Sequence, residues 1–176
     1  KAFVTGGFRL PEGKHELAWL DADTILVGTE WEEGQLTASG YPYIIKSVKR
    51  GQTLAGAHEL FRGDAKDVAT ASIVLRDAEG AVQAIIAARS LGFFTTEYYF
   101  IDGFIDGHTP VKLPLPLKST VRSLVRGKLV FTLEEDWPAQ NLKQGDLAAY
   151  DLAALRADPE HAVPQLVLRP GAREAI

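Results

Sequence analysis

The sequence has 176 residues, of which 46% are hydrophobic and 24% are charged, a composition typical of a globular domain rather than of a disordered or fibrous chain. Its 19 Lys and Arg residues against 23 Asp and Glu residues give a formal charge of −4, so composition provides no general attraction to nucleic acid or to an anionic membrane. Because cysteine is absent, disulfides, thiolate metal sites and cysteine nucleophiles are excluded.

The chain shows no membrane-crossing run and no secretion signal. No apolar stretch approaches the roughly 18 residues that a bilayer requires, and the N-terminus lacks a charged segment followed by an apolar one. The sequence leaves the compartment open between cytoplasm and periplasm. The chain also contains no methionine and opens on Lys1-Ala2-Phe3-Val4 as if within a strand, which indicates a piece of a longer protein.

Short runs rich in branched and aromatic residues alternate with turn signals and predict strands. After residues 1–10, expected to be a strand of an earlier unit, the first four predicted strands cover 15–20, 25–31, 43–51 and 57–63. In the second of them, Ile25, Val27, Thr29 and Trp31 occupy alternate positions, which predicts one face directed at a core.

The same order of four strands then returns twice. The second round covers 71–76, 81–89, 96–102 and 110–116, and the third covers 119–125, 128–136, 145–152 and 162–170. Short helical turns are expected within 55–60 and 152–158. Each round takes roughly 50 residues, the scale of one four-stranded propeller blade. The sequence therefore predicts an all-β, partial β-propeller of about three antiparallel blades, with approximate ranges 11–63, 67–116 and 119–169.

An arc of three blades cannot close a ring, since propellers usually have about four to eight. Its two outer faces would then lack the neighbours that cover them in a complete propeller. Exposed apolar patches tend to recruit a partner, so we expect the isolated chain to self-associate. The apolar residues of 1–8 (KAFVTGGF) and 129–133 (LVFTL) are the expected contact regions.

Three basic residues, Lys46, Lys49 and Arg50, cluster at the end of the third predicted strand. One interpretation is a binding patch. The favoured interpretation is that they keep the outer part of a sheet soluble and discourage pairing between strand edges.

No catalytic, cofactor-binding or metal-binding residue is predicted. The G-x-S-x-G motif of α/β-hydrolases is absent, and Ser39 and Ser90 each have glycine on one side at most, in a context that favours loops or strands. The spacing of phosphate-binding glycine loops is also missing. The histidines lie in four separate segments without the close pairing of zinc sites: His15, His58, His108 and His161.

Two acidic clusters and seven aromatic residues are interpreted as structural features. The carboxylates of Glu30, Glu32 and Glu33 and those of Glu134, Glu135 and Asp136 are interpreted as acidic loop rims, because adjacent strand residues point to opposite faces and cannot flank one substrate. Packing between blades, rather than a stacking platform for bases or sugars, is expected for seven aromatic residues: Tyr41, Tyr43, Phe93, Phe94, Tyr98, Tyr99 and Phe100.

Three stretches carry a family resemblance: 6–31 (GGFRLPEGKHELAWLDADTILVGTEW), 36–54 (LTASGYPYIIKSVKRGQTL) and 59–68 (ELFRGDAKDV). They resemble the N-terminal β-propeller of bacterial prolyl oligopeptidase-type serine peptidases. The likeness is strongest over residues 6–68 and continues more loosely through FFTTEYYF and LPLP to LVFTLEEDW. The third round departs from the pattern, because QNLKQGDLAAYDLAALRADPEHA is long and irregular.

Members of that family set a seven-bladed propeller over an α/β-hydrolase domain whose Ser, Asp and His cleave peptides after proline. The resemblance implies that this chain is a non-catalytic size filter or lid, with the hydrolase domain of the same parent chain as its partner and short peptides as the parent's substrates. No catalytic residue can be carried over, since the matching positions lie outside the sequence. The alternative is a stand-alone propeller module that binds a protein or glycan on its loop face. A G-x-S-x-G motif followed by Asp and His downstream would separate the two.

Overall fold

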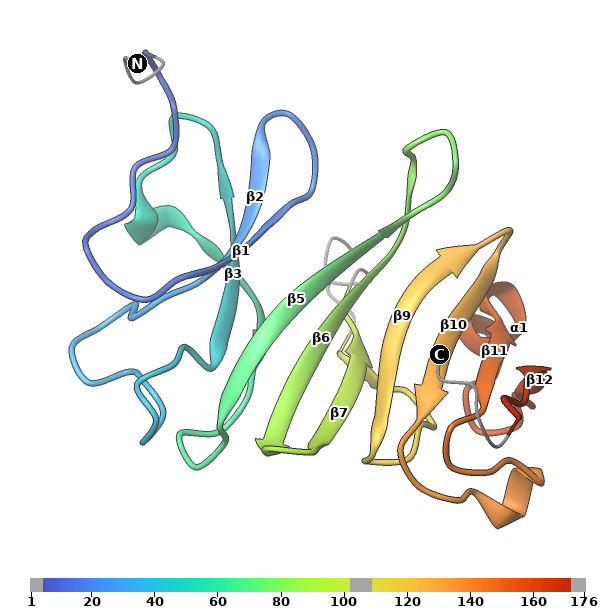
Figure 1. Cartoon of the computed structure of the whole chain (residues 1–176). Helices are drawn as coiled ribbons and strands as arrows, with labels where there is room; N and C mark the ends of the chain where they lie inside the picture. The colour runs from blue at the N-terminus through green and yellow to red at the C-terminus, as the bar shows by residue number, and fades with distance from the viewer. Residues whose placement is uncertain (1–4, 102–108, 172–176) are drawn as a thin grey trace.

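The computed structural model describes residues 5–101 and 109–171. Within these ranges twelve strands form three four-stranded sheets, and the pairing is antiparallel throughout (Figure 1). The predicted all-β fold class and the threefold return of four strands are confirmed.

Each sheet pairs its strands in chain order. The first sheet contains β1 (Glu16–Trp19), β2 (Thr24–Gly28), β3 (Ile44–Lys49) and β4 (His58–Arg62). The second contains β5 (Ala69–Arg76), β6 (Val82–Gly92), β7 (Thr95–Phe100) and β8 (Val111–Lys112). The third contains β9 (Ser119–Val125), β10 (Lys128–Leu133), β11 (Leu147–Asp151) and β12 (Gln165–Leu168). The three sheets fall within the ranges 11–63, 67–116 and 119–169.

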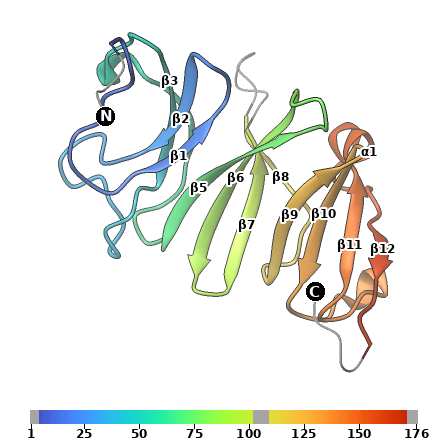
Figure 2. The same cartoon turned by 45° about the horizontal axis from the view of Figure 1, so that its top comes forward.

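The sheets stand next to one another like the blades of a propeller (Figure 2). Strand β5 contacts β1 of the first sheet and β9 of the third, so the first strands of successive sheets are neighbours. The fourth strands, β4, β8 and β12, form the opposite edges of the sheets. The chain therefore has the architecture of a partial propeller.

Apolar side chains fill the two spaces between the sheets. Leu26, Ile45 and Phe61 of the first sheet pack with Ile85 and Ala87 of the second. A larger cluster joins the second sheet to the third and includes these residues: Ala84, Ile86, Tyr98, Phe100, Leu129, Phe131, Leu133 and Tyr150. Because Leu129, Phe131 and Leu133 are buried there, the expectation that 129–133 as a whole forms a contact surface is wrong. Because β6 contributes to both clusters, its residues 84–87 form an unbroken apolar run, as expected for a strand buried on both faces.

The two ends of the sheets differ in their turns. We call the end at which β1, β5 and β9 begin the lower end, after its position in Figure 1, and the opposite end the upper end. At the upper end, Asp21 and Asp77 accept hydrogen bonds from backbone N–H groups of their own turns. The β9–β10 hairpin turns there at Arg126 and Gly127, whose φ angles of 48° and 74° match a tight two-residue turn.

A short helix, α1 (Leu152–Ala157), follows β11 and confirms the helical turn expected within 152–158. The Asp151 carboxylate caps it by accepting a hydrogen bond from the Ala154 N–H at 3.0 Å, and Leu152 and Leu155 are buried in the core between the second and third sheets. The other expected helical turn lies earlier than 55–60. A 3₁₀ turn covers Leu54–Gly56, and β4 already begins at His58.

Several predicted strands differ from the structure. Residues 5–10 form a turn and irregular backbone rather than a strand, and residues 1–4 lie outside the described part. Strand β2 ends at Gly28, so Thr29 and Trp31 belong to a loop. Strand β8 is reduced to Val111–Lys112, because Pro110 precedes it and further prolines follow, and proline cannot donate to a sheet ladder.

Candidate functional site

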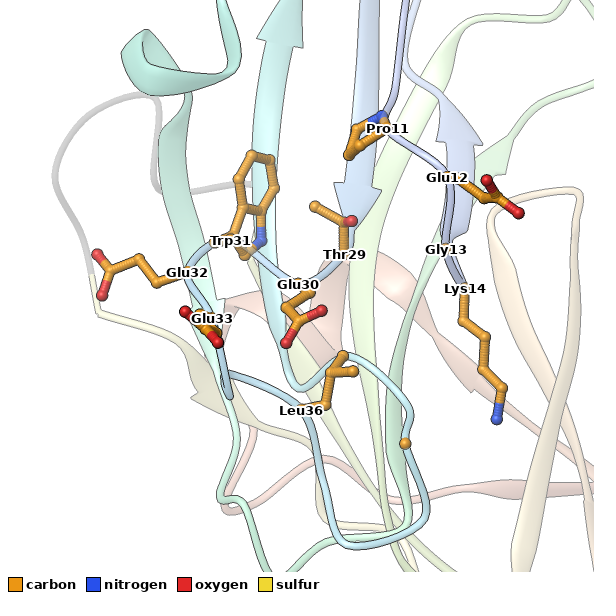
Figure 3. Close-up of a pocket in the computed structure, with 11 residues that line it drawn as sticks. Pro11, Glu12, Gly13, Lys14, Thr29, Glu30, Trp31, Glu32, Glu33 and Leu36 are labelled. Carbon is orange, nitrogen blue, oxygen red and sulfur yellow. The ribbon is translucent and has the colours of Figure 1, made fainter.

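A pocket of about 530 Å³ opens at the lower end of the first sheet. One side is formed by residues 11–14, just before β1, and the other by residues 29–36, just after β2 (Figure 3). Its lining combines an indole and a leucine with several carboxylates and one ammonium: Trp31, Leu36, Glu12, Glu30, Glu32, Glu33 and Lys14. Such a lining suits a ligand with an apolar face and groups that donate hydrogen bonds to carboxylates.

A histidine ties the two sides of this pocket together. The His15 Nε2 atom lies 2.8 Å from the Pro11 carbonyl oxygen, and Nδ1 lies 2.9 Å from Thr29 Oγ1. Since a carbonyl only accepts, Nε2 carries a proton and donates to Pro11, and a neutral imidazole then accepts the Thr29 hydroxyl at Nδ1. Thr29 is buried, so this hydroxyl is a structural group rather than an accessible nucleophile.

The acidic cluster after β2 mostly closes its own loop. Glu30 accepts a hydrogen bond from the Gly34 N–H at 2.8 Å, and Glu32 accepts one from the Gln35 side-chain amide at 2.7 Å. The prediction that these carboxylates form an acidic loop rim therefore agrees with the structure. The reason given for it, that adjacent residues on a strand point to opposite faces, does not apply, because these residues lie in a loop.

The three basic residues of the third strand do not form one patch. The Lys46 ammonium lies over the Trp31 ring, 4.8 Å from its centroid, beside the lower pocket. The Arg50 guanidinium instead bonds Asp23 Oδ1 at 2.8 Å in the upper β1–β2 turn. Because β3 lies between β2 and β4, the expectation that Lys46 and Lys49 protect a sheet edge is also wrong.

The aromatic residues divide into two groups. Tyr98 and Phe100 are buried between sheets, and the Tyr99 ring lies 5.0 Å from that of Phe61, as expected for packing residues. Phe93 and Phe94 instead form the β6–β7 turn at the lower end, where they are 92% and 72% exposed. For these two, and for Tyr41, which is 39% exposed with the Lys14 ammonium 4.2 Å from its ring centroid, the expectation of packing between blades is wrong.

An ion pair supports the lower end where the first sheet leads into the second. Arg89 of β6 donates from Nε and Nη2 to the Asp67 carboxylate at 2.7 and 3.0 Å, and the same carboxylate accepts the Asp64 N–H at 2.6 Å. Asp67 is buried, and its hydrogen bond raises the pKa of Arg89. The pair therefore fixes the loop that connects the sheets.

Beside this pair, Glu97 of β7 accepts hydrogen bonds from Lys112 Nζ and from the Tyr99 hydroxyl. Burial acts to raise the pKa of Glu97, but the hydrogen bonds from Lys112 and Tyr99 hold it below its ordinary value.

A second Asp–Arg pair lies in the third sheet and has the same geometry as the first. Arg169 binds the buried Asp146 carboxylate at 2.8 and 2.6 Å. The hydrogen bond from Arg169 lowers the pKa of Asp146.

The two serines and the histidines of the described chain lie in separate parts of the fold. Ser39 lies in the loop before β3 and Ser90 near the end of β6. His58 begins β4, His161 pairs with Asp158 after α1, and His108 lies outside the described residues. Among the described residues, no three His, Asp or Glu side chains are placed to hold a metal ion, and no helix is long and apolar enough to span a bilayer.

Curated proteins with similar sequences are named as peptidases. No family model matches the chain. A protein of Sinorhizobium fredii named uncharacterized peptidase y4nA is 38% identical over 99% of this chain, and a Rickettsia prowazekii protein, also named an uncharacterized peptidase, is 25% identical over 100% of it. This chain is homologous to a segment of proteins named as peptidases. It spans only 24% and 26% of the lengths of these two curated relatives.

A solved structure shows the same fold. A post-proline cleaving enzyme from Rickettsia typhi matches 98% of this chain with a TM-score of 0.86 and 23% sequence identity, and the match covers 27% of that enzyme. The resemblance stated from residues 6–68 and their looser continuation is confirmed. The chain therefore has the propeller-like fold of one segment of that enzyme, and its homologues are named as peptidases.

Sequence reasoning missed the exposed pair at the β6–β7 turn and the two Asp–Arg pairs. The sequence does contain a signal for the exposed pair, because the seven residues from Ser90 to Thr96, which span the turn between two strands, contain no charge. The ion pairs join residues more than 20 positions apart, and no local pattern marks such partners.

Proposed function

We propose that this chain is a non-catalytic propeller segment of a prolyl oligopeptidase-type serine peptidase, and that it acts as a size filter or lid over an α/β-hydrolase domain elsewhere in the parent chain. The observation that carries the proposal is the match of the whole chain to about a quarter of relatives named as peptidases. Short peptides would be the parent's substrates. The segment would contribute exclusion and make or break no bond.

The exposed aromatic pair at one end of the sheets supports an orientation for this lid. Both ends have charged turns, with Asp21, Asp77 and Arg126 at the upper end and Glu30, Glu32 and Glu33 at the lower end. The lower end carries the pocket beside Trp31 and the exposed Phe93 and Phe94. Exposed aromatic pairs mark interaction surfaces, so we place the lower end toward the hydrolase domain and the space that holds the peptide.

A filter must keep its shape while substrates press against it. The Asp67–Arg89 pair and the His15 contacts hold the loops of the lower end to the sheets. Folded proteins would be excluded because the loop held by Asp67 and Arg89 cannot move away without losing charged hydrogen bonds, which cost more to break than neutral ones. Short peptides would pass without such a rearrangement.

The test uses the longer protein that carries this segment. Phe93→Ser with Phe94→Ser alters the lower end, and Asp77→Ser with Glu79→Ser is the matched control at the upper end. We expect the first pair to raise kcat/KM for a long proline-containing polypeptide relative to a fluorogenic Gly-Pro dipeptide, and the second to leave that ratio unchanged. An unchanged ratio in the first variant, or a changed ratio only in the control, would contradict the proposal.

The isolated chain provides a second test of the non-catalytic assignment. Because it supplies no nucleophile elbow, we expect it to hydrolyse neither substrate. Turnover that persists through purification and is blocked by a serine-directed inhibitor would overturn the non-catalytic assignment.

A second candidate function is a stand-alone propeller that binds a glycan or protein on its loop face. The pocket favours it, because an indole can stack on a sugar face while carboxylates accept its hydroxyls. Titration of the chain with oligosaccharides, followed by Trp31 fluorescence, tests this candidate; a saturable response abolished by Trp31→Ala and kept by Trp137→Phe would support it. A G-x-S-x-G motif with later Asp and His in the parent would instead support the lid.

A further inference from the structure

Arg76 joins the first and second sheets at the upper end. It is the last residue of β5, and its Nη2 atom donates to the carbonyl oxygens of Trp19 and Leu20, where β1 ends, at 2.8 and 2.9 Å. Its Nη1 atom donates to the Gly80 carbonyl oxygen in the β5–β6 turn at 3.0 Å. One half-buried guanidinium therefore holds the β1–β2 turn against the β5–β6 turn.

These hydrogen bonds lie on the channel side of the arc. Strands β1 and β5 are the first strands of their sheets and contact each other, whereas the fourth strands form the opposite edges (Figure 2). Because neighbouring blades of a propeller surround a central channel and approach each other most closely there, the contacting first strands mark the channel side. Arg76 therefore lies at the upper rim of that channel.

The space between the first and second sheets, here called the first seam, is fastened more firmly at its lower end. The Asp67 carboxylate, which binds Arg89, is buried there. In the same region the Thr70 N–H donates to the Pro42 carbonyl oxygen at 3.0 Å, beside the pair. Arg76 has only backbone carbonyls as acceptors among the described residues, and charged partners give stronger hydrogen bonds than neutral ones. The upper end of the first seam is thus the end that opens first.

The space between the second and third sheets is closed differently at its upper end. Helix α1 buries Leu152 and Leu155 in that space, and Arg156 of the same helix donates to the Gln83 carbonyl oxygen of β6 at 2.6 Å. Among the described residues, no helix covers the upper end of the first seam in this way. Leu20 and Val74, which pack there, are only partly buried. Closure of the first seam at the upper rim therefore depends strongly on Arg76.

We propose that Arg76 determines how wide a peptide can enter the channel, because it latches the upper rim of the first seam. While its bonds are made, the β1–β2 and β5–β6 turns stay together; when they break, the upper ends of the two sheets separate about the fixed lower end. With the lower end toward the hydrolase domain, the upper end is the mouth through which a peptide enters. This inference rests on the proposed lid function and names a residue that sets its size limit.

Arg126 provides a matched control. It follows β9, the first strand of the third sheet, and lies in the upper β9–β10 turn. Among the described residues it makes no hydrogen bond to another sheet. Arg76→Met and Arg126→Met each remove one positive charge and keep an unbranched side chain, but only the first removes bonds between sheets. Arg76→Lys keeps the charge without the planar fork of donors, so its effect should be intermediate.

The first measurement is the distance across the upper rim. The chain has no cysteine, so Ala22→Cys and Glu79→Cys, at exposed positions of the β1–β2 and β5–β6 turns, provide two specific sites for spin labels. Electron–electron double resonance, with unlabelled chain in excess, then reports distances within one chain. We expect Arg76→Met to increase the population of separated turns about tenfold, equivalent to about 1.4 kcal/mol, and Arg126→Met to leave it unchanged. Circular dichroism should show the same strand content in all variants.

The second measurement uses the longer protein that carries this segment. A linear peptide with one Gly-Pro bond is compared with its head-to-tail cyclic form, which has the same bond but is wider. We expect Arg76→Met to raise kcat/KM for the cyclic peptide relative to the linear one, and Arg126→Met to leave this ratio unchanged.

Two results would overturn the proposal. Label distances that stay the same in Arg76→Met would show that Arg76 is no latch, even where the Phe93 and Phe94 variants support the lid. Wider distances with an unchanged ratio of cyclic to linear peptide would show that the latch does not set the size limit. A failure of the lid proposal itself would appear in the Phe93 and Phe94 variants and would leave the label distances unaffected.

Discussion

The second and third sheets have the same strand order but opposite surroundings. In the second sheet, Ile85 and Ile86 are neighbours on β6, and each faces a different sheet across a buried interface. In the third, Leu129 is buried and Val130 beside it lines an open face. The same β-branched and aliphatic residues thus serve as core or as surface according to whether a neighbouring sheet is present. Position in the stack, more than local sequence, decides what each side chain contributes.

The largest expected effect is a truncation in the sandwiched sheet. Ile86 is fully buried among side chains of two sheets, so Ile86→Ala removes apolar contacts and leaves a cavity. We expect a loss of about 3 kcal/mol in the free energy of unfolding, measured by urea denaturation. The control Val130→Ala, on the open face, should cost less than half as much. Equal losses would show that the outer face is covered in solution.

The repeat of strands was predictable because turn signals and branched residues mark each strand locally. The surroundings of each sheet were not predictable, because they depend on packing between residues 40 or more positions apart. Ile45 and Ile85, for example, belong to one buried cluster. The early end of β2 is another example. Thr29 leaves the strand pattern to bond His15, and a side chain at Gly28 would lie 3.2 Å from Pro42, contacts that the alternation of Ile25 and Val27 does not reveal.

The candidate site was predicted only in part. The acidic residues after β2 were recognised as a loop rim, and the resemblance pointed to a peptidase propeller. The pocket itself needed residues 11–14 to meet residues 29–36, an encounter fixed by the His15 hydrogen bonds rather than by any motif. Phe93 and Phe94 were assigned to packing because aromatic residues in β-rich chains usually pack, whereas their place in a tight turn exposes them.

A second prediction concerns the junction of the first and second sheets. Arg89→Ala would leave the buried Asp67 carboxylate with the Asp64 N–H but without its cation. We expect a loss of about 2 kcal/mol in the free energy of unfolding, which is less than for a fully buried pair because Arg89 is partly exposed. Asp67→Ala combined with Arg89→Ala should cost less than the sum of the single changes. Additive losses would mean that the two side chains do not act as a pair.

A third prediction concerns pH at the interface of the second and third sheets. Burial raises the pKa of Tyr150 to about 12, and its hydroxyl donates to the Pro114 carbonyl at 3.1 Å. Since the unfolded chain loses this proton near pH 10, stability should be complete below pH 10 and fall as pH rises toward 12. Tyr150→Phe should lower stability at neutral pH, because it loses a hydrogen bond, and should flatten the alkaline decline in urea midpoints. An equally steep decline in the variant would assign it to other groups.

The smallest expected effect is on the open face of the third sheet. Val167→Thr changes a side chain that is 54% exposed, and threonine keeps the branched shape that favours a strand. We therefore expect the free energy of unfolding to change by no more than about 0.5 kcal/mol when measured at a dilution where the chain is monomeric. Urea denaturation measures this change, and a loss above about 1 kcal/mol would show that Val167 is packed against other residues in solution.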